Sequence, residues 1–95
     1  MLVSVVIIAK NEAGNIAACI KSAELLSNDI IVVDSGSKDG TQDIAAQAKA
    51  SVHFIEWQGY GNARNAGAAQ AKHEWIFALD ADERISKKLA EVIKK

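Results

Sequence analysis

The chain has 95 residues, of which 49% are hydrophobic and 24% charged, and a formal net charge of -1 at pH 7. This composition predicts one small globular domain and excludes an intrinsically disordered chain. It gives no electrostatic basis for binding nucleic acid or an anionic membrane, and the single cysteine, Cys19, excludes an intrachain disulfide.

Helical spacing and short apolar runs alternate along the chain. In order, they predict strand 3–9, helix 12–26, strand 29–34, helix 42–50, strand 51–57, helix 60–72, strand 74–80 and a last helix beginning near Ser86. The strands are rich in Val and Ile, and the first two are continuously apolar, which is typical of strands covered on both faces. Asn11 and Thr41 are the expected N-caps of the first two helices.

This alternation predicts βαβ units with right-handed crossovers. The expected fold class is α/β: a Rossmann-like, three-layer half domain with a mostly parallel four-stranded sheet. Residues 1–95 form a single domain in this interpretation. We expect Leu89, Val92 and Ile93 of the last helix to face inward, and we expect the chain to be the N-terminal part of a larger unit.

Polar residues follow three of the four predicted strands. These clusters are residues 10–12, residues 34–41 and residues 80–84. In an open parallel sheet the carboxyl ends of the strands share one edge, and ligands bind there. The sequence therefore predicts one polar site built from three distant segments.

Asp34 ends the second predicted strand and opens the sequence D-S-G-S-K-D-G-T. Its carboxylate has two interpretations from the residues alone: an acceptor for a ligand in the crevice, or a turn residue that bonds to its own loop. The pattern itself does not choose between them.

Asp80 and Asp82 follow the fourth predicted strand. Residues i and i+2 of an extended chain share a face, about 6.5–7 Å apart. A divalent cation such as Mg²⁺ stabilises two carboxylates so placed and takes its other ligands from waters and phosphates. The alternative is a solvated acidic turn that continues through Glu83 and Arg84.

The segment Gly59-Tyr60-Gly61 does not match a dinucleotide-binding fingerprint, because the third glycine is misplaced and the turn after the first strand lacks the motif. By spacing alone Arg64 is a surface residue of the helix that follows. Trp57 and Trp75 are expected in the core or at its rim, and His53 in structural or exposed positions.

Four motifs, V-S-V-V-I-I-A-K-N-E, D-S-G-S-K-D-G-T, G-N-A-R-N-A-G and L-D-A-D-E-R, occur in this order over nearly the whole chain. Together they resemble the nucleotide-binding half of family 2 glycosyltransferases, inverting enzymes of the GT-A fold. The resemblance is strongest to bacterial members that act in lipopolysaccharide core or surface-glycan biosynthesis.

The resemblance implies roles for the matching positions. Asp82 would ligate Mn²⁺ or Mg²⁺, Asp80 would face the ribose and sugar, and Arg64 would contact the base or diphosphate. The remaining residues of the nucleotide-sugar site would be Ile8, Lys10, Asn11, Glu12 and Asp34.

The implied substrates are a nucleotide-diphosphate sugar, with UDP as the expected nucleotide, and a glycan or glycolipid acceptor. The resemblance assigns no catalytic base, and the acceptor-binding region is expected to be absent from these 95 residues, which would leave the chain inactive alone. The expected location is the cytoplasm, with the whole enzyme at the inner face of a membrane but without a membrane span.

Two other interpretations stay open at this point. In a phosphatase or phosphotransferase of the haloacid-dehalogenase kind, Asp80 would be a nucleophile, although Arg84 stands near where that motif carries threonine. In a non-catalytic interaction module, an uncovered sheet edge would pair two copies as a homodimer.

Overall fold

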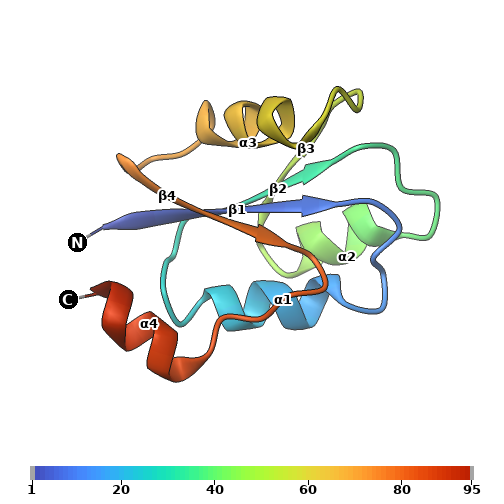
Figure 1. Cartoon of the computed structure of the whole chain (residues 1–95). Helices are drawn as coiled ribbons and strands as arrows, with labels where there is room; N and C mark the ends of the chain where they lie inside the picture. The colour runs from blue at the N-terminus through green and yellow to red at the C-terminus, as the bar shows by residue number, and fades with distance from the viewer. Residues whose placement is uncertain (1, 95) are drawn as a thin grey trace.

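The computed structural model describes residues 2–94 as three layers (Figure 1). A sheet of four parallel strands has the order β3-β2-β1-β4. The strands and helices alternate as β1 (Val3–Ala9), α1 (Ile16–Ala23), β2 (Ile30–Asp34), α2 (Thr41–Gln47), β3 (Ser51–Phe54), α3 (Tyr60–Ala68), β4 (Trp75–Asp80) and α4 (Lys87–Lys94). The expected α/β class and the parallel sheet are confirmed.

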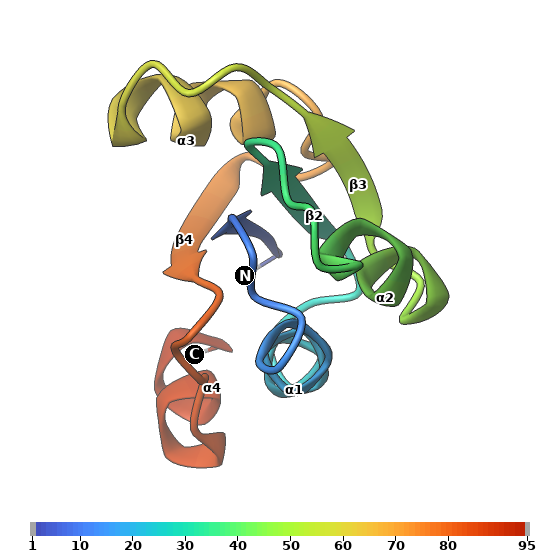
Figure 2. The same cartoon turned by 90° about the vertical axis from the view of Figure 1, so that its right-hand side faces the viewer.

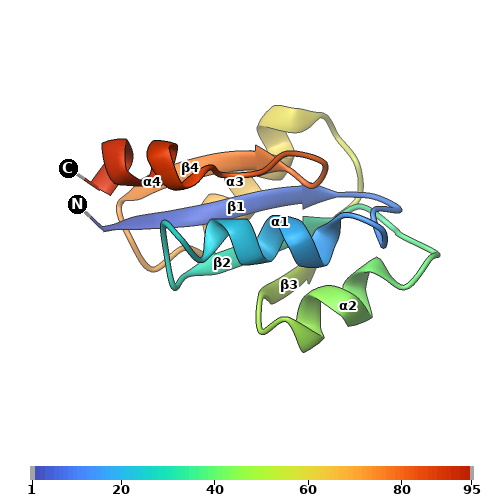
Figure 3. The same ribbon diagram turned by 90° about the horizontal axis from the view of Figure 1, so that it is seen from below.

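The helices divide unequally between the two faces of the sheet. Figure 2, which looks along the strands, shows α3 alone on one face and α1 and α4 on the other, with α2 beside them near β3. The larger apolar cluster lies under α1, α2 and α4, and a smaller one lies under α3 around Val6, Ile31, Val33 and Ala63. Figure 3 shows α1 and α4 running along the sheet from below.

Strand β1 is the centre of the fold because it pairs with both β2 and β4. Its residues Val5, Val6 and Ile7 are completely buried, as are Ile31 and Val32 of β2. The continuous apolar runs in the sequence are explained by this position, since both faces of these two strands lie against helices.

Helix α3 lies unusually close to the sheet at Gly67. A Cβ atom at this residue would lie 2.4 Å from Cγ1 of Val6 and 3.0 Å from Cγ2 of Val33. Only glycine fits at this contact, and the neighbouring Ala63 is also fully buried. The small residues on one side of α3 therefore set the distance between helix and sheet.

Several expected boundaries were wrong by a few residues. Helix α1 begins at Ile16, because Glu12–Asn15 form a turn in which the N–H groups of Asn15 and Ile16 donate to the Glu12 carbonyl. Asn11 is therefore not its N-cap, and Gly40 precedes α2 where Thr41 was expected as the cap. Both side chains instead make contacts between loops.

Strand β3 ends at Phe54, three residues earlier than expected. Its partner β2 ends at Asp34, which pairs with Phe54, and the last bond of the ladder runs from the Ile55 N–H to the Asp34 carbonyl. Trp57 therefore lies in the loop after β3 and not in the strand. In α4, Leu89 and Val92 do not face inward; Ala90 packs against the core in their place, with Ile93 half-buried beside it.

At the amino ends of the strands, a buried polar network holds three segments together. Ser4 Oγ donates to Asp29 Oδ2 at 2.6 Å, the Lys72 N–H donates to the same oxygen at 2.7 Å, and the His73 N–H donates to Ser4 Oγ. Hydrogen bonding from Ser4 and Lys72 outweighs desolvation and lowers the pKa of Asp29. This network lies at the end opposite the predicted site.

No helix within residues 2–94 has the length and apolar character needed to cross a bilayer.

Candidate functional site at the carboxyl edge of the sheet

A cavity of about 380 Å³ opens where the strand order reverses. The chain runs outward from β1 through β2 to β3 and then returns to place β4 on the other side of β1. Ligands of open α/β sheets bind at such a switch point, outside the carboxyl ends of the strands. The cavity is lined by Ile8, Ala9, Lys10, Glu12, Ser35, Trp57, Tyr60, Asp80, Ala81 and Asp82.

The register of β1 and β4 places the acidic motif in this cavity. Ile8 pairs with Asp80, and the Ala81 N–H continues the ladder by donating to the Ile8 carbonyl at 3.2 Å. Ala81 is buried, whereas Asp80 and Asp82 on either side of it are exposed. The two carboxylates are therefore available to a ligand.

The loop that carries these carboxylates is held by its own neighbours. Glu83 Oε1 accepts from the Asp80 N–H at 2.8 Å. The Arg84 guanidinium donates to the carbonyls of Ala81 and Glu83 and, at 3.0 Å, to Asn15 Oδ1 at the start of α1. Arg84 thus fixes the acidic loop against α1, a positioning role that the sequence analysis did not assign.

Negative charge accumulates around Asp80. Desolvation raises its pKa, and the nearby carboxylates of Glu83, Asp82 and Glu12 raise it further, opposed only in part by Arg64. A divalent cation bound next to Asp80 would favour the ionised form of the Asp80 carboxyl group.

This donor set fits Mg²⁺ or Mn²⁺, which prefer oxygen ligands and take waters and phosphates to complete their coordination. No group of three or more His, Cys, Asp or Glu side chains among residues 2–94 could hold a metal ion by itself. Any cation would therefore need ligand oxygens from its substrate or from water.

The loops after β1 and β2 are joined by a row of hydrogen bonds, which we call the loop clamp. The consecutive N–H groups of Asn11, Glu12 and Ala13 donate to Ser37 Oγ at 2.7 Å, Thr41 Oγ1 at 2.9 Å and Asp39 Oδ2 at 3.1 Å. The Asn11 side chain accepts from the Lys38 N–H. Asn11 thus belongs to the clamp and does not line the cavity.

Asp34 is completely buried behind the cavity. Oδ2 accepts from the N–H groups of Gly36 and Ser37 and from Gln42 Nε2, and Oδ1 accepts from Ser37 Oγ. Desolvation would raise the pKa of Asp34, but the hydrogen bonds from Ser37, Gln42 and Gly36 outweigh it and hold the pKa below its ordinary value. The turn interpretation describes this carboxylate in the structure.

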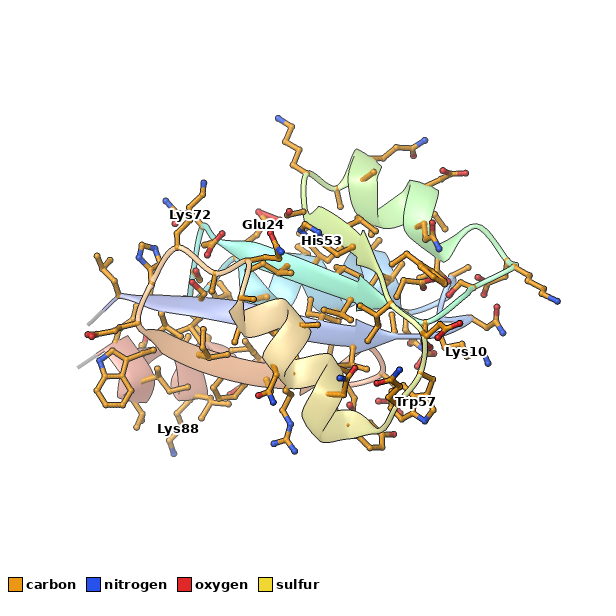
Figure 4. All side chains as sticks on the ribbon, turned by 90° about the horizontal axis from the view of Figure 1, so that it is seen from above. Lys10, Glu24, His53, Trp57, Lys72 and Lys88 are labelled. Atoms are coloured by element: carbon orange, nitrogen blue, oxygen red, sulfur yellow. The ribbon has the colours of Figure 1, made fainter. Side chains whose placement is uncertain are left out.

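Arg64 lies on the exposed side of α3, at a second cavity of about 430 Å³. Ile8, Tyr60 and Asp80 border both cavities. Lys10 is exposed at the rim of the first one, and Figure 4 shows Lys10 and Trp57 at the same end of the sheet. The two cavities therefore form one surface on either side of Asp80.

The structure brings together five of the predicted site residues at the main cavity: Ile8, Lys10, Glu12, Asp80 and Asp82. It adds the aromatic side chains of Trp57 and Tyr60, which the sequence analysis did not assign to the site. The sequence signal for an accessible Tyr60 was the glycine on each side of it, because glycine has no side chain that could cover the tyrosine ring.

The sequence profile described as glycosyl transferase family 2 matches residues 4–95. An uncharacterized glycosyltransferase of Rickettsia felis is 41% identical over 91 residues, which are 96% of this chain and 32% of that protein. The lipopolysaccharide core biosynthesis glycosyltransferase LpsC of Rhizobium meliloti is 36% identical, over 95% of this chain and 35% of its own length. The chain thus spans about a third of the curated relatives that it matches.

Solved structures share the fold. The structure of S. aureus TarS superimposes on 99% of this chain with a TM-score of 0.84 and 25% identity, covering 31% of the TarS chain. Glucosyl-3-phosphoglycerate synthase from Mycobacterium tuberculosis, in complex with Mn²⁺, uridine diphosphate and glucosyl-3-phosphoglycerate, matches 84% of this chain with a TM-score of 0.72 and 28% identity, covering 33% of that chain. The expected GT-A type of fold is confirmed by these matches.

Proposed function

Because this chain belongs to glycosyl transferase family 2, we propose that it forms the donor-binding half of an inverting, metal-dependent glycosyltransferase. The observation that carries the proposal is the pair of exposed carboxylates, Asp80 and Asp82, at the switch point of the sheet. The family membership also argues against the alternative interpretation as a phosphatase or phosphotransferase, in which Asp80 would be a nucleophile.

In this proposal the acidic loop binds the diphosphate end of a nucleotide sugar. Asp82 ligates Mn²⁺ or Mg²⁺ with Asp80 beside it, and Arg64 contacts the diphosphate from α3. The cation would neutralise the charge that develops on the departing nucleoside diphosphate. The complex of the mycobacterial synthase with Mn²⁺ and uridine diphosphate supports this choice of ligands.

The β1 end supplies the other wall of the donor site. Ile8 and Lys10 line it through their backbone groups, and Asn11 and Glu12 hold its loop in place through the clamp. Asp34 Oδ1 accepts from Ser37 Oγ alone and keeps a lone pair, but the residue is completely buried, so a base N–H would reach it only after a neighbouring side chain such as the half-buried Gln42 moved.

The acceptor in this proposal is a glycan or glycolipid, in keeping with the name of the Rhizobium meliloti relative. Deprotonation of the acceptor is assigned to no residue of this chain. A cytoplasmic location, the absence of an acceptor-binding region and the pairing of two copies stay predictions.

The test is calorimetric titration of UDP into the chain with and without Mn²⁺. Replacing Asp82 by alanine is expected to weaken Mn²⁺-dependent binding by roughly tenfold or more, about 1.4 kcal/mol. No hydrogen bond from residues 2–94 reaches this exposed carboxylate, so its loss removes a ligand without disturbing the fold.

Asp43→Ala is the matched control, since Asp43 is an exposed aspartate in the first turn of α2, outside both cavities. Its binding of UDP should equal that of the unsubstituted chain. Equal binding by the Asp82 variant would show that Asp82 is not a metal ligand, and Mn²⁺-independent binding would contradict the metal-dependent mechanism.

A further inference from the structure

Asn15 occupies the N-cap position of α1, but its side chain does not cap the helix. Asparagine is a preferred N-cap residue because its side-chain oxygen accepts from N–H groups of the first turn. Here the half-buried Asn15 side chain uses both of its polar atoms on other segments of the chain. The stability of α1 therefore does not account for these hydrogen bonds.

The Asn15 amide joins a guanidinium to a carboxylate. Its Oδ1 accepts from Arg84 Nη2 at 3.0 Å, and its Nδ2 donates to Glu12 Oε1 at 3.2 Å. Only this orientation of the amide satisfies both neighbours, because a guanidinium only donates and an ionised carboxylate only accepts. We call this arrangement the Arg84–Asn15–Glu12 bridge.

The bridge connects two walls of the main cavity. On one side, Arg84 Nη1 donates to the carbonyls of Ala81 at 3.1 Å and Glu83 at 2.8 Å, within the acidic loop. On the other side, Glu12 lines the cavity, and its N–H donates to Thr41 Oγ1 in the loop clamp. A continuous series of hydrogen bonds therefore runs from the loop after β4 to the loops after β1 and β2.

Helix α1 holds the acidic loop at two further points. The Ile85 N–H donates to Ser22 Oγ at 3.0 Å, and the Cys19 thiol donates to the Asp80 carbonyl at 3.7 Å. Asn15, Cys19 and Ser22 have the i, i+4, i+7 spacing of a single helix face. The acidic loop is therefore attached along one side of α1, with the bridge at the end nearest the cavity.

The acidic loop has no regular secondary structure to keep it ordered. Residues 81–86 lie between β4 and α4, outside any strand or helix. Ordering flexible backbone costs conformational entropy, and a site that is ordered before its ligand arrives avoids this cost on binding. Hydrogen bonds that fix the loop from outside the cavity would thus strengthen binding without touching the ligand.

We propose that Asn15 and Arg84 are positioning residues of the donor site. Through the bridge they hold the acidic loop against the loop after β1, so that both carboxylates of the acidic loop are in place before the cation and the diphosphate bind. Neither residue lines either cavity, so both act through other groups. This inference rests on the proposed function of the cavity.

The geometry of Arg84 distinguishes the bridge from a simple effect of positive charge. Within residues 2–94 its hydrogen bonds go to three uncharged oxygens, two carbonyls and the Asn15 amide. Lysine would keep the charge but has a single nitrogen in place of the planar fork that reaches these oxygens together. Arg84→Lys therefore removes the bridge and preserves the charge.

Calorimetric titration of UDP with Mn²⁺ tests the bridge, with Asn15→Ser as the main variant. Serine caps helices as well as asparagine does, but its short hydroxyl cannot join Arg84 to Glu12. We expect UDP affinity to fall roughly threefold to tenfold, the range of one lost hydrogen bond. The unfolding midpoint in urea should not fall, and Arg84→Lys should show the same loss of affinity.

Asn28→Ser is the matched control, because Asn28 lies in the turn before β2 and outside both cavities. It should bind UDP as the unsubstituted chain does. The double variant of Asn15→Ser and Arg84→Lys should bind no more weakly than the weaker single variant, since either change alone already breaks the bridge. Inorganic pyrophosphate with Mn²⁺ should show the same losses, because it needs only the acidic loop.

The outcomes separate this inference from the proposed function. Loss of Mn²⁺-dependent binding in Asp82→Ala, with unchanged UDP affinity in Asn15→Ser or in Arg84→Lys, would overturn the bridge and leave the donor site standing. Losses that multiply in the double variant, or that affect UDP but not pyrophosphate, would also overturn it. Absence of UDP and pyrophosphate binding in the unsubstituted chain would overturn both proposals.

A general role in the fold has a different signature. If Asn15 and Arg84 served only the stability of the chain, both variants would have lower unfolding midpoints, and the affinity would fall in step with them. That result would overturn the positioning role. The bridge requires instead that affinity falls while the midpoint of Asn15→Ser is maintained.

Discussion

Replacing Gly67 by alanine is expected to lower the free energy of unfolding by about 2 kcal/mol, within the range for overpacked cores. The new Cβ would lie 2.4 Å from Cγ1 of Val6 and 3.0 Å from Cγ2 of Val33. These valines are 0% and 1% exposed in the two central strands and have no free space to enter. Helix α3 would therefore have to move away from the sheet.

Urea denaturation followed by circular dichroism measures this change. Gly61→Ala is the control in the same helix, because a Cβ there meets no atom within 4 Å. That substitution should raise the free energy of unfolding by about 0.5–1 kcal/mol through helix propensity. Equal unfolding midpoints for Gly67→Ala and the unsubstituted chain would contradict the close contact of α3 with β1.

Asp34→Ala is expected to lower the free energy of unfolding by about 2–4 kcal/mol, since buried donors left without acceptors are costly. The substitution removes the acceptor of the Gly36 and Ser37 N–H groups and of the Gln42 amide. It also frees Ser37, whose hydroxyl accepts from Asn11 in the loop clamp. The damage should therefore spread to the β1 loop.

The pH dependence follows from the lowered pKa of Asp34. A carboxyl group whose pKa is lower in the folded state stabilises the fold above its unfolded value, about 3.9. This contribution is lost as the pH falls through the lower, folded value. The stability difference between the unsubstituted chain and Asp34→Asn should accordingly be largest near neutral pH and shrink below about pH 4.

Asp34→Asn is also the matched variant for shape. Its remaining carbonyl oxygen can accept from the Gly36 and Ser37 N–H groups, so its loss of stability should be smaller than that of alanine. Urea titrations at pH 7 and at pH 3.5 give the comparison. A difference between the two proteins that stays constant over this range would show that the Asp34 carboxylate is not ionised preferentially in the folded state.

The sequence predicted the arrangement of strands well because a short, continuous run of Val and Ile favours a strand buried on both faces. Val3–Ala9 was predicted with both bounds correct, and the other three strands began within one residue of their observed starts. The predicted boundaries were wrong where pairing with another strand determines the end of an element. Nothing local in the sequence shows that β3 must end at Phe54, since that depends on β2 ending at Asp34.

The site was predicted in outline for a related reason. Strand ends in a parallel sheet share an edge whatever the details, so Asp80, Asp82 and Lys10 were expected together and are found together. Asp34 was different, because one carboxylate can serve a ligand or its own turn, and only the folded structure shows its four donors. Trp57 was expected in the core or at its rim because local composition carries no information on which surface an aromatic residue lines.

The central position of β1 has a consequence for how the protein reaches its native state. Residues 3–9 form their second set of strand contacts with residues 75–80, so the pairing that juxtaposes Ile8 with Asp80 must close a loop of most of the chain. Non-local pairings of this kind slow folding, because the entropy of loop closure is lost before the contacts form. The ligand cavity and the last strand pairing therefore appear in the same step. In a refolding experiment, the nucleotide affinity that the proposed function predicts should emerge with the slowest phase, after most helical signal has already returned.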